Sequence, residues 1–210
     1  MLILGLTGGS GAGKSTVLRV WADLGAYTID ADVTYHRLLR EDAALLGALR
    51  ARFPEAFASG GLDRKALGRI VYASKERQRE LEQITHGAVI TDVERELEAA
   101  RLNGYKTAAV EALYLLENPL RQRFAAVLGV IAPYEARLGR LMTRDGLSRD
   151  YAAARLAAQP DDAYYRARCD MILENDSGTA ELARRAREMF MQFTVHNSQF
   201  TIAESPSTTE

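Results

Sequence analysis

The feature that most constrains this chain is the glycine-rich stretch GLTGGSGAGKST at residues 5–16. It contains the pattern Gly-x-x-x-x-Gly-Lys-Ser between Gly8 and Ser15, and an apolar run precedes it. Its side chains are too small to build a core. Glycines instead allow backbone N–H groups to turn inward and approach phosphate oxygens without an obstructing Cβ. The pattern therefore predicts a strand, a phosphate-binding loop and a helix in succession.

Two side chains at the start of the expected helix fit the same site. Lys14 supplies a mobile positive charge that can reach the β- and γ-phosphates, and the Ser15 hydroxyl can ligate Mg²⁺. The helix itself adds unpaired N–H groups and the positive end of its dipole. A glycine-rich turn without a ligand is the alternative, but it does not explain why Lys-Ser-Thr opens a helix directly after an apolar strand. We therefore expect nucleotide binding.

Strands and helices alternate along the chain, which indicates an α/β fold with a parallel sheet. The expected strands occupy residues 2–6, 26–30, 106–113, 124–132 and 170–174. The expected helices occupy residues 14–24, 32–40, 42–53, 63–74, 75–102, 133–143, 148–158 and 179–193. We predict a single kinase domain over residues 1–195, with a helical insertion at about 33–102 and a lid at about 137–160. Residues 196–210 are polar and aperiodic, so we expect a flexible C-terminal tail.

Composition excludes several other classes of protein. The 210 residues are 47% hydrophobic and 26% charged with a net charge of −1, which gives no basic field for nucleic acid. A single cysteine, Cys169, excludes an internal disulfide framework and a multi-cysteine metal site. No apolar run reaches membrane-spanning length. We expect a soluble cytoplasmic protein, a monomer or small homo-oligomer, with no nucleic acid or membrane partner.

Two carboxylates follow the second expected strand. Asp30 and Asp32 stand at its carboxyl end, and in open parallel sheets ligands bind beyond the carboxyl ends of the strands. One of them could accept the proton of an attacking hydroxyl or hold that hydroxyl by a hydrogen bond. Alternatively, Asp32 caps the following helix. Spacing alone leaves catalysis and capping open.

An arginine-rich segment at residues 137–159 is typical of a lid. A turn at Asp145-Gly146 separates two expected helices, and such a segment can close over a nucleotide and neutralise a transferring phosphoryl group. Arg140, Arg144 and Arg155 are the candidates for that role, whereas we interpret Arg137 and Arg149 as ordinary surface arginines. A regulatory GTPase would carry Asn-Lys-x-Asp and Asp-x-x-Gly, and the chain contains neither.

Six motifs in order along the chain resemble those of dephospho-CoA kinases. They are GLTGGSGAGKST, IDAD, LEQITHGAVI, EALYLLEN, RDGLSRDYAAARLAAQ and CDMILENDSG, and together they span about residues 2–193. The resemblance implies a P-loop α/β core with a lid and a helical CoA-binding region. It also implies transfer of the ATP γ-phosphoryl group to the ribose 3′-hydroxyl of dephospho-CoA, with Mg²⁺.

Residue roles carried over from that resemblance follow the matching motifs. Asp32 would be the base, with Lys14 and Arg140 as further catalytic residues. ATP would contact Arg144, Arg155, Asn175 near the adenine, and the loop residues Gly11, Ala12, Gly13, Lys14, Ser15 and Thr16. Ser15 would bind the metal.

The acceptor side departs from the family pattern at two places. His86-Gly87 stands where the family often has His-Pro, and Glu111 to Glu117 stands where it often has Asp-x-Pro-Leu-Leu-Phe-Glu. We expect His86, Glu111 and Glu117 to bind substrate, with Glu111 able to hold Mg²⁺ through water. A kinase of another nucleotide-like acceptor and a nucleotide-dependent switch protein are the alternative functions.

Overall fold

The computed structural model describes residues 1–58, 60–117 and 119–203. The chain divides into two compact units. One, here called the sheet unit, contains residues 1–29 and the chain from residue 100 onward, and the other, the helical unit, contains residues 30–99. Each unit has its own hydrophobic core. Whether the two behave as one domain stays a prediction.

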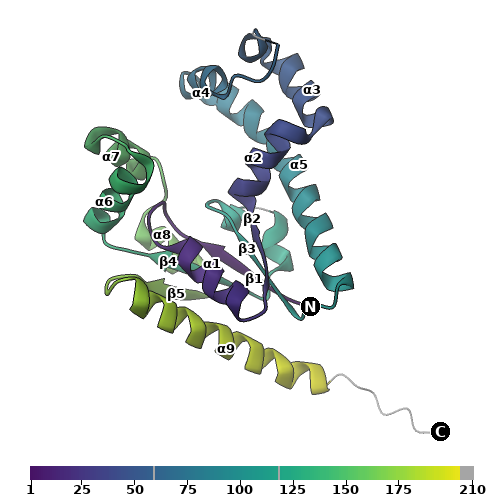
Figure 1. Cartoon of the computed structure of the whole chain (residues 1–210), viewed down its shortest axis with the longest axis vertical. Helices are drawn as coiled ribbons and strands as arrows, with labels where there is room; N and C mark the ends of the chain where they lie inside the picture. The colour runs from purple at the N-terminus through teal and green to yellow at the C-terminus, as the bar shows by residue number, and fades with distance from the viewer. Residues whose placement is uncertain (59, 118, 204–210) are drawn as a thin grey trace, which may run out of the picture. The chain divides into compact units, whose positions relative to one another are not determined.

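The sheet unit is built on five strands in the order β2-β3-β1-β4-β5 (Figure 1). Their bounds are β1 Leu2–Thr7, β2 Tyr27–Asp30, β3 Thr107–Glu111, β4 Ala126–Ile131 and β5 Met171–Glu174. β1 pairs in parallel with both β3 and β4, and β4 pairs in parallel with β5. The predicted α/β fold with a parallel sheet is confirmed. Because these strands are parallel, their carboxyl ends meet at one edge of the sheet.

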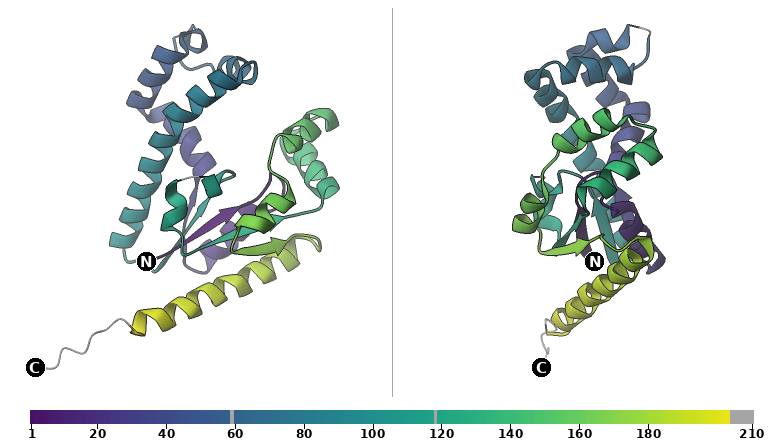
Figure 2. Two further views of the ribbon diagram at one scale, coloured as in Figure 1. Left: turned by 180° about the vertical axis from the view of Figure 1, so that it is seen from behind. Right: turned by 90° about the vertical axis from the view of Figure 1, so that its left-hand side faces the viewer.

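Successive residues of β1 point to opposite faces of the sheet, and helices pack on both faces. Leu2, Leu4 and Leu6 pack into the core formed with α1, Lys14–Asp23, and α9, Thr179–Ala203. Gly5 faces the other way, where a Cβ would meet Leu115 and Val127 within 3 Å. Helix α8, Asp162–Arg168, lies on that second face, with the 3₁₀ turns η2, Leu115–Glu117, and η3, Pro119–Arg123 (Figure 2).

The contact between α1 and α9 centres on Trp21. Its side chain is fully buried, and its indole Nε1 donates a hydrogen bond to the Ala186 carbonyl at 3.0 Å. Phe190 and Phe193 of α9 pack against the same ring, with centroids 5.9 and 6.3 Å away. Since α1 directly follows the glycine loop, this packing fixes the helix whose first turn forms part of the loop's site.

The helical unit contains four helices around a core of leucine and phenylalanine. They are α2 Ala31–Glu41, α3 Ala43–Arg52, α4 Arg64–Tyr72 and most of α5 Lys75–Leu102, with the short 3₁₀ turn η1 Pro54–Phe57. Leu49 and Phe53 are fully buried at its centre. Asp30, Asp42 and Asp63 accept hydrogen bonds from the first turns of α2, α3 and α4, as N-cap residues do.

Two α-helices differ from the sequence prediction. Helix α8 was not predicted, because seven residues give little hydrophobic periodicity, although Asp161 caps it. Helix α9 continues ten residues beyond the predicted end at Phe193. The chain has neither glycine nor proline between Phe193 and Ala203, so no residue there interrupts a helix. The predicted flexible tail falls partly on residues 204–210, which lie outside the described residues.

The remaining helices form the arginine-rich segment of the sheet unit. They are α6, Tyr134–Asp145, and α7, Arg149–Ala157, and they pack together through Leu138, Leu141 and Leu156. Gly146 ends α6 with a φ of 65°, the left-handed C-cap conformation that glycine favours. Among the described residues, no helix has the length and apolar character required to cross a membrane.

We predict that Trp21→Phe lowers the free energy of unfolding by about 1–3 kcal/mol, because it removes buried ring volume and the hydrogen bond to Ala186. Urea denaturation followed by circular dichroism measures the change. Tyr134→Phe is the control, since Tyr134 is half exposed and its substitution should change stability by less than about 0.5 kcal/mol. Equal stability of the two variants would contradict the assigned role of Trp21.

Candidate phosphate-binding site

The glycine loop leaves β1 and passes directly against β4. Gly8 has a φ of 139°, and a Cβ on it would lie 2.1 Å from the Val130 carbonyl oxygen. No other residue type fits that approach. The loop then reaches α1 through Gly13, whose φ of 114° is again left-handed. The sequence predicted this strand, loop and helix correctly.

Three consecutive carbonyl groups of the loop are bonded from outside by side chains of other elements. Arg137 Nε donates to Ser10 O at 3.1 Å, Arg140 Nη1 to Gly11 O at 2.8 Å, and Asn175 Nδ2 to Ala12 O at 2.7 Å. A trans peptide is planar, with its C=O and N–H pointing in opposite directions. Holding a carbonyl outward therefore turns the next residue's N–H toward the other side of the loop.

Between Gly11 and Ser15, four backbone N–H groups remain open. Those of Gly11, Gly13, Lys14 and Ser15 have no acceptor among the described residues. The Ala12 N–H bonds to the Gly9 carbonyl at 3.1 Å and does not belong to this set. Open N–H groups at a helix N-terminus favour an anion, and a phosphate chain offers the several oxygens that such a set can bind.

Lys14 lies beside this set and faces a carboxylate. Its Nζ is 3.4 Å from Glu111 Oε1 and 3.5 Å from the Gly9 carbonyl. The two side chains are only 11% and 8% exposed. Glu111 ends β3 opposite Leu6 of β1, so the pairing register brings this carboxylate to the loop. An arriving phosphate would compete with Glu111 for the same ammonium group.

Two of the predicted lid arginines converge on one carboxylate. Arg144 bonds to both oxygens of Asp145, and Arg155 Nη1 lies 3.2 Å from Asp145 Oδ2. The hydrogen bond with Arg144 lowers the pKa of Asp145, and the same bond raises the pKa of Arg144. Both guanidinium groups are exposed, so they remain accessible to a phosphate.

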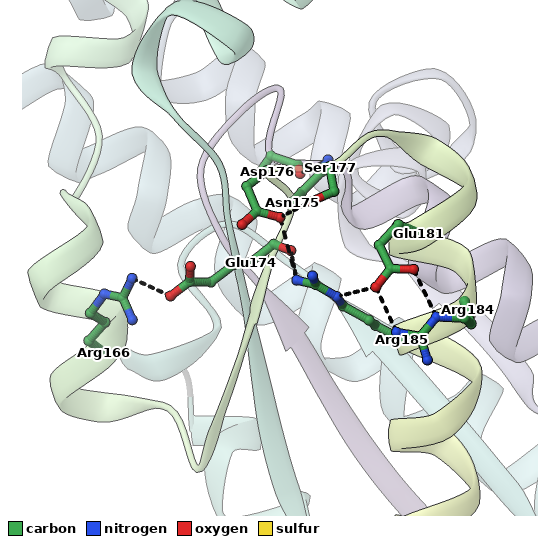
Figure 3. Close-up of polar contacts among 9 residues, drawn as sticks. Arg166, Glu174, Asn175, Asp176, Ser177, Glu181, Arg184 and Arg185 are labelled. Atoms are coloured by element: carbon green, nitrogen blue, oxygen red, sulfur yellow. Dashed lines mark hydrogen bonds and ion pairs between the residues drawn. The ribbon is translucent and has the colours of Figure 1, made fainter.

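Asn175 belongs to the short loop between β5 and α9, and this loop is tied down by ion pairs (Figure 3). Arg185 of α9 donates to the Glu174 carbonyl at 3.2 Å and lies 3.4 Å from Asp176 Oδ1. Glu181 holds Arg185 in turn at 2.7 Å. Bonds from Arg184 and Arg185 lower the pKa of Glu181 to about 2. These contacts keep the backbone around Asn175 in place.

Two further predicted site residues, Glu117 and His86, belong to different units of the chain. Glu117, in the sheet unit, bonds to the Tyr164 hydroxyl and lies 3.6 Å from Arg168. His86 is exposed on α5 of the helical unit.

Hydrogen bonds at the start of α2 exclude the alternative that Asp32 is the helix cap. The cap of α2 is Asp30, whose Oδ1 accepts hydrogen bonds from the N–H groups of Asp32 and Val33 at 2.9 and 3.0 Å. Asp32 is exposed in the first helical turn, and its carboxylate has no hydrogen bond or ion pair within the described part of the chain. The interpretation of Asp32 as the capping residue is therefore wrong, because the cap lies two residues earlier.

Comparison with known proteins identifies the family. The family model for dephospho-CoA kinase matches residues 2–181. The chain belongs to the dephospho-CoA kinase family. The dephospho-CoA kinase of Geobacter sulfurreducens is 38% identical, covering 90% of this chain and 98% of its own, and that of Corynebacterium diphtheriae is 34% identical, covering 92% and 98%.

Solved structures agree with this family. The Thermus thermophilus protein TT1252 has a TM-score of 0.80 and 35% identity, and the dephospho-CoA kinase of Campylobacter jejuni has 0.58 and 28%. Each comparison covers 91% of this chain and 96% of the other. Shikimate kinase of Acinetobacter baumannii, at 17% identity and a TM-score of 0.50 over 99% and 96% of the two chains, shares the fold alone.

In this dephospho-CoA kinase family member, inspection of the sequence missed two side chains that contact the glycine loop, Arg137 and Gln159. Arg137 is buried rather than on the surface, so its interpretation as a surface arginine is wrong, whereas Arg149 is exposed as expected. Gln159 bonds to Ser10. The available signal was spacing, since Arg137 and Arg140 stand three residues apart and share one helix face.

We predict that Asn175→Asp weakens ATP binding about tenfold or more and destabilises the fold by about 1–3 kcal/mol. A carboxylate cannot donate to the buried Ala12 carbonyl and repels it. Calorimetric titration with ATP and urea denaturation measure the two effects. Asn103→Asp is the control, because Asn103 is exposed in the turn after α5. Unchanged ATP affinity in Asn175→Asp would contradict the role of this amide.

Proposed function

We propose that this chain transfers the γ-phosphoryl group of ATP to the ribose 3′-hydroxyl of dephospho-CoA, giving CoA and ADP. The observation that carries the proposal is the set of four open N–H groups at Gly11, Gly13, Lys14 and Ser15, in a chain of the dephospho-CoA kinase family. Phosphoryl transfer relies mainly on positioning and charge stabilisation, which such a rigid loop supplies.

The residues beside the loop suit Mg²⁺ bound together with the phosphates. No group of three or more His, Cys, Asp or Glu side chains in the described chain could hold a metal by itself. Mg²⁺ usually keeps several waters and takes only one or two protein ligands alongside substrate phosphates. The exposed Ser15 hydroxyl would ligate it, and Glu111 would hold one of its waters. The ion would neutralise charge on the β- and γ-phosphates.

Charge on the transferred group would be met by three arginines of the lid segment, residues 137–160. Arg144 and Arg155 are exposed and held side by side by Asp145. Arg140 is half-buried and bonds to the loop through Nη1. We assign Arg144 and Arg155 to the phosphates and Arg140 to the reacting phosphoryl group, together with Lys14.

The acceptor hydroxyl would be received by Asp32. Its carboxylate is exposed and without a bond to the described chain, so it is available to accept a proton or orient the hydroxyl. The helical unit, which carries Asp32 and His86, would bind the rest of dephospho-CoA. Glu117 would also contribute to acceptor binding.

The test of the proposed function is a panel of acceptors offered with MgATP to the purified full chain. We expect phosphorylation of dephospho-CoA, measured as CoA formation by liquid chromatography, at a kcat/KM at least about 100-fold above AMP, CMP and shikimate. Equal or better turnover of a nucleoside monophosphate would show that the acceptor is a different one.

Asp32→Asn tests the proton acceptor. We expect kcat to fall by roughly 10²–10⁴, the usual range for a positioned acid or base, with ATP affinity and melting temperature unchanged. Stability is preserved because the cap of α2 is Asp30 and not Asp32. In a loose transition state the attacking hydroxyl needs little deprotonation, which would place the decrease in kcat near the lower limit of this range.

Asp30→Asn and Asp63→Asn serve as matched variants for this experiment. Asparagine caps a helix about as well as aspartate, so both should keep the helical unit folded. Full activity of Asp32→Asn together with inactive Asp30→Asn would move the base to Asp30. Asp63→Asn should retain full activity in either case.

A further inference from the structure

Every polar group of Ser10, in the middle of the glycine loop, is bonded to a side chain of the lid segment. The Ser10 N–H donates to Gln159 Oε1 at 2.8 Å, and Gln159 Nε2 donates to Ser10 Oγ at 2.7 Å. Arg137 Nε donates to the Ser10 carbonyl at 3.1 Å. No other residue of the loop has its N–H, C=O and side chain all engaged in this way among the described contacts.

The two partners of Ser10 come from the two ends of the lid segment. Arg137 is in the first turn of α6, and Gln159 follows the last residue of α7 by two positions. The orientation of the Gln159 amide is fixed by its partner, because a backbone N–H can only donate and must face the amide oxygen. Arg137 and Gln159 therefore form a closed set of contacts on one loop residue, here called the Ser10 clamp.

Arg137 is buried to a degree unusual for an arginine. The side chain is 7% exposed, and its Nη1 lies 3.6 Å from Asp162 Oδ1 of α8. Nη2 is buried with no hydrogen-bond acceptor in the described chain, and it lies over Gly9, where a Cβ would be 2.1 Å from it. Burial of a charge with an unused donor costs free energy. Because burying Arg137 lowers stability, its presence here is better explained by a role in holding the loop in its binding conformation.

The peptide between Ser10 and Gly11 explains what the clamp does. Because this peptide is trans and planar, holding the Ser10 carbonyl toward Arg137 points the Gly11 N–H away from it. The Gly11 N–H is the first of the four open donors. Gln159 Oε1 accepts the hydrogen bond of the Ser10 N–H, so this N–H is not available to a phosphate.

We propose that Arg137 and Gln159 are positioning residues that fix Ser10, so that the loop is organised for ATP before the nucleotide arrives and stays tied to both ends of the lid segment. This inference rests on the proposed function, since it concerns the ATP side of that reaction. Neither side chain needs to touch the substrate. Their effect on ATP passes through the Gly11 N–H.

The first experiment compares Arg137→Ala with Arg137→Lys and the control Arg149→Ala. Arg149 is exposed on α7, and within the described part of the chain its ion-pair partner is Glu135, so its loss should leave activity unchanged. We expect Arg137→Ala to raise the Kd and KM for ATP about 10- to 100-fold, the effect of losing a charged hydrogen bond, with KM for dephospho-CoA within twofold. Arg137→Lys should recover part of the loss, because an ammonium can still donate to the Ser10 carbonyl.

The second experiment reaches the same contact from the loop. The φ of Gly9 lies outside the left-handed region, so alanine fits its backbone, and the atoms nearest the added Cβ all belong to the Arg137 guanidinium. Gly9→Ala should therefore displace Arg137 and weaken ATP binding to a similar extent. In the double variant with Arg137→Ala the two losses should not add, because only one contact is lost.

Gln159→Leu tests the other partner and should weaken ATP binding about tenfold through loss of two neutral hydrogen bonds. If Arg137→Ala fails to fold, Gly9→Ala and Gln159→Leu decide the question. ATP affinity within twofold of wild type in these folded variants would overturn the inference and leave the proposed function intact. Failure of the wild-type chain to bind ATP would overturn both.

Discussion

The outward bonding of three loop carbonyls is the constraint on which the site depends. A glycine-rich loop by itself has many conformations, and most of them scatter its N–H groups. Here Arg137, Arg140 and Asn175 each hold one carbonyl, so the conformation of the loop is set without a ligand present. Organisation of this kind spares a ligand the free energy of ordering the loop. The side chains that hold the carbonyls come from two connections of the sheet: Arg137 and Arg140 follow β4, and Asn175 follows β5. The geometry of the loop therefore depends on the parallel sheet.

The loop glycines have a different explanation from the one that the motif suggests. The motif accounts for them by the close approach of phosphate. In this structure the space at Gly9 is taken by the guanidinium of Arg137, and the space at Gly13 by the Asn175 amide, 2.6 Å from where a Cβ would be. Gly8 is limited by the Val130 carbonyl. At Gly8 and Gly13 a positive φ and neighbouring groups of the protein therefore require glycine before any phosphate is considered, whereas a side chain at Gly9 would displace the end of the flexible Arg137 side chain.

Sequence inspection predicted the strands, most helices and the loop because each has a local signal. Apolar runs marked the strands, and the lysine and serine after the last loop glycine marked the start of α1. The support of the loop could not be found in this way. Arg137 and Gln159 lie 127 and 149 residues from Ser10. The three-residue spacing between Arg137 and Arg140 is a weak local signal, and it does not show that Arg137 is buried while Arg149 of α7 is exposed. The cap of α2 shows a similar limit, because Asp30 and Asp32 are both suitable capping residues and only hydrogen-bond geometry distinguishes them.

The three aspartate caps of the helical unit also bear on dynamics. Residues 30–99 have their own apolar core, and Asp30, Asp42 and Asp63 satisfy the first turns of their helices with bonds made entirely inside the unit. A segment stabilised from within can exchange its amide hydrogens as one cooperative group, at an opening free energy separate from that of the sheet. A substitution within residues 30–99 would accordingly change how readily that unit opens, while the glycine loop, bonded by Arg137, Arg140, Gln159 and Asn175, keeps its form.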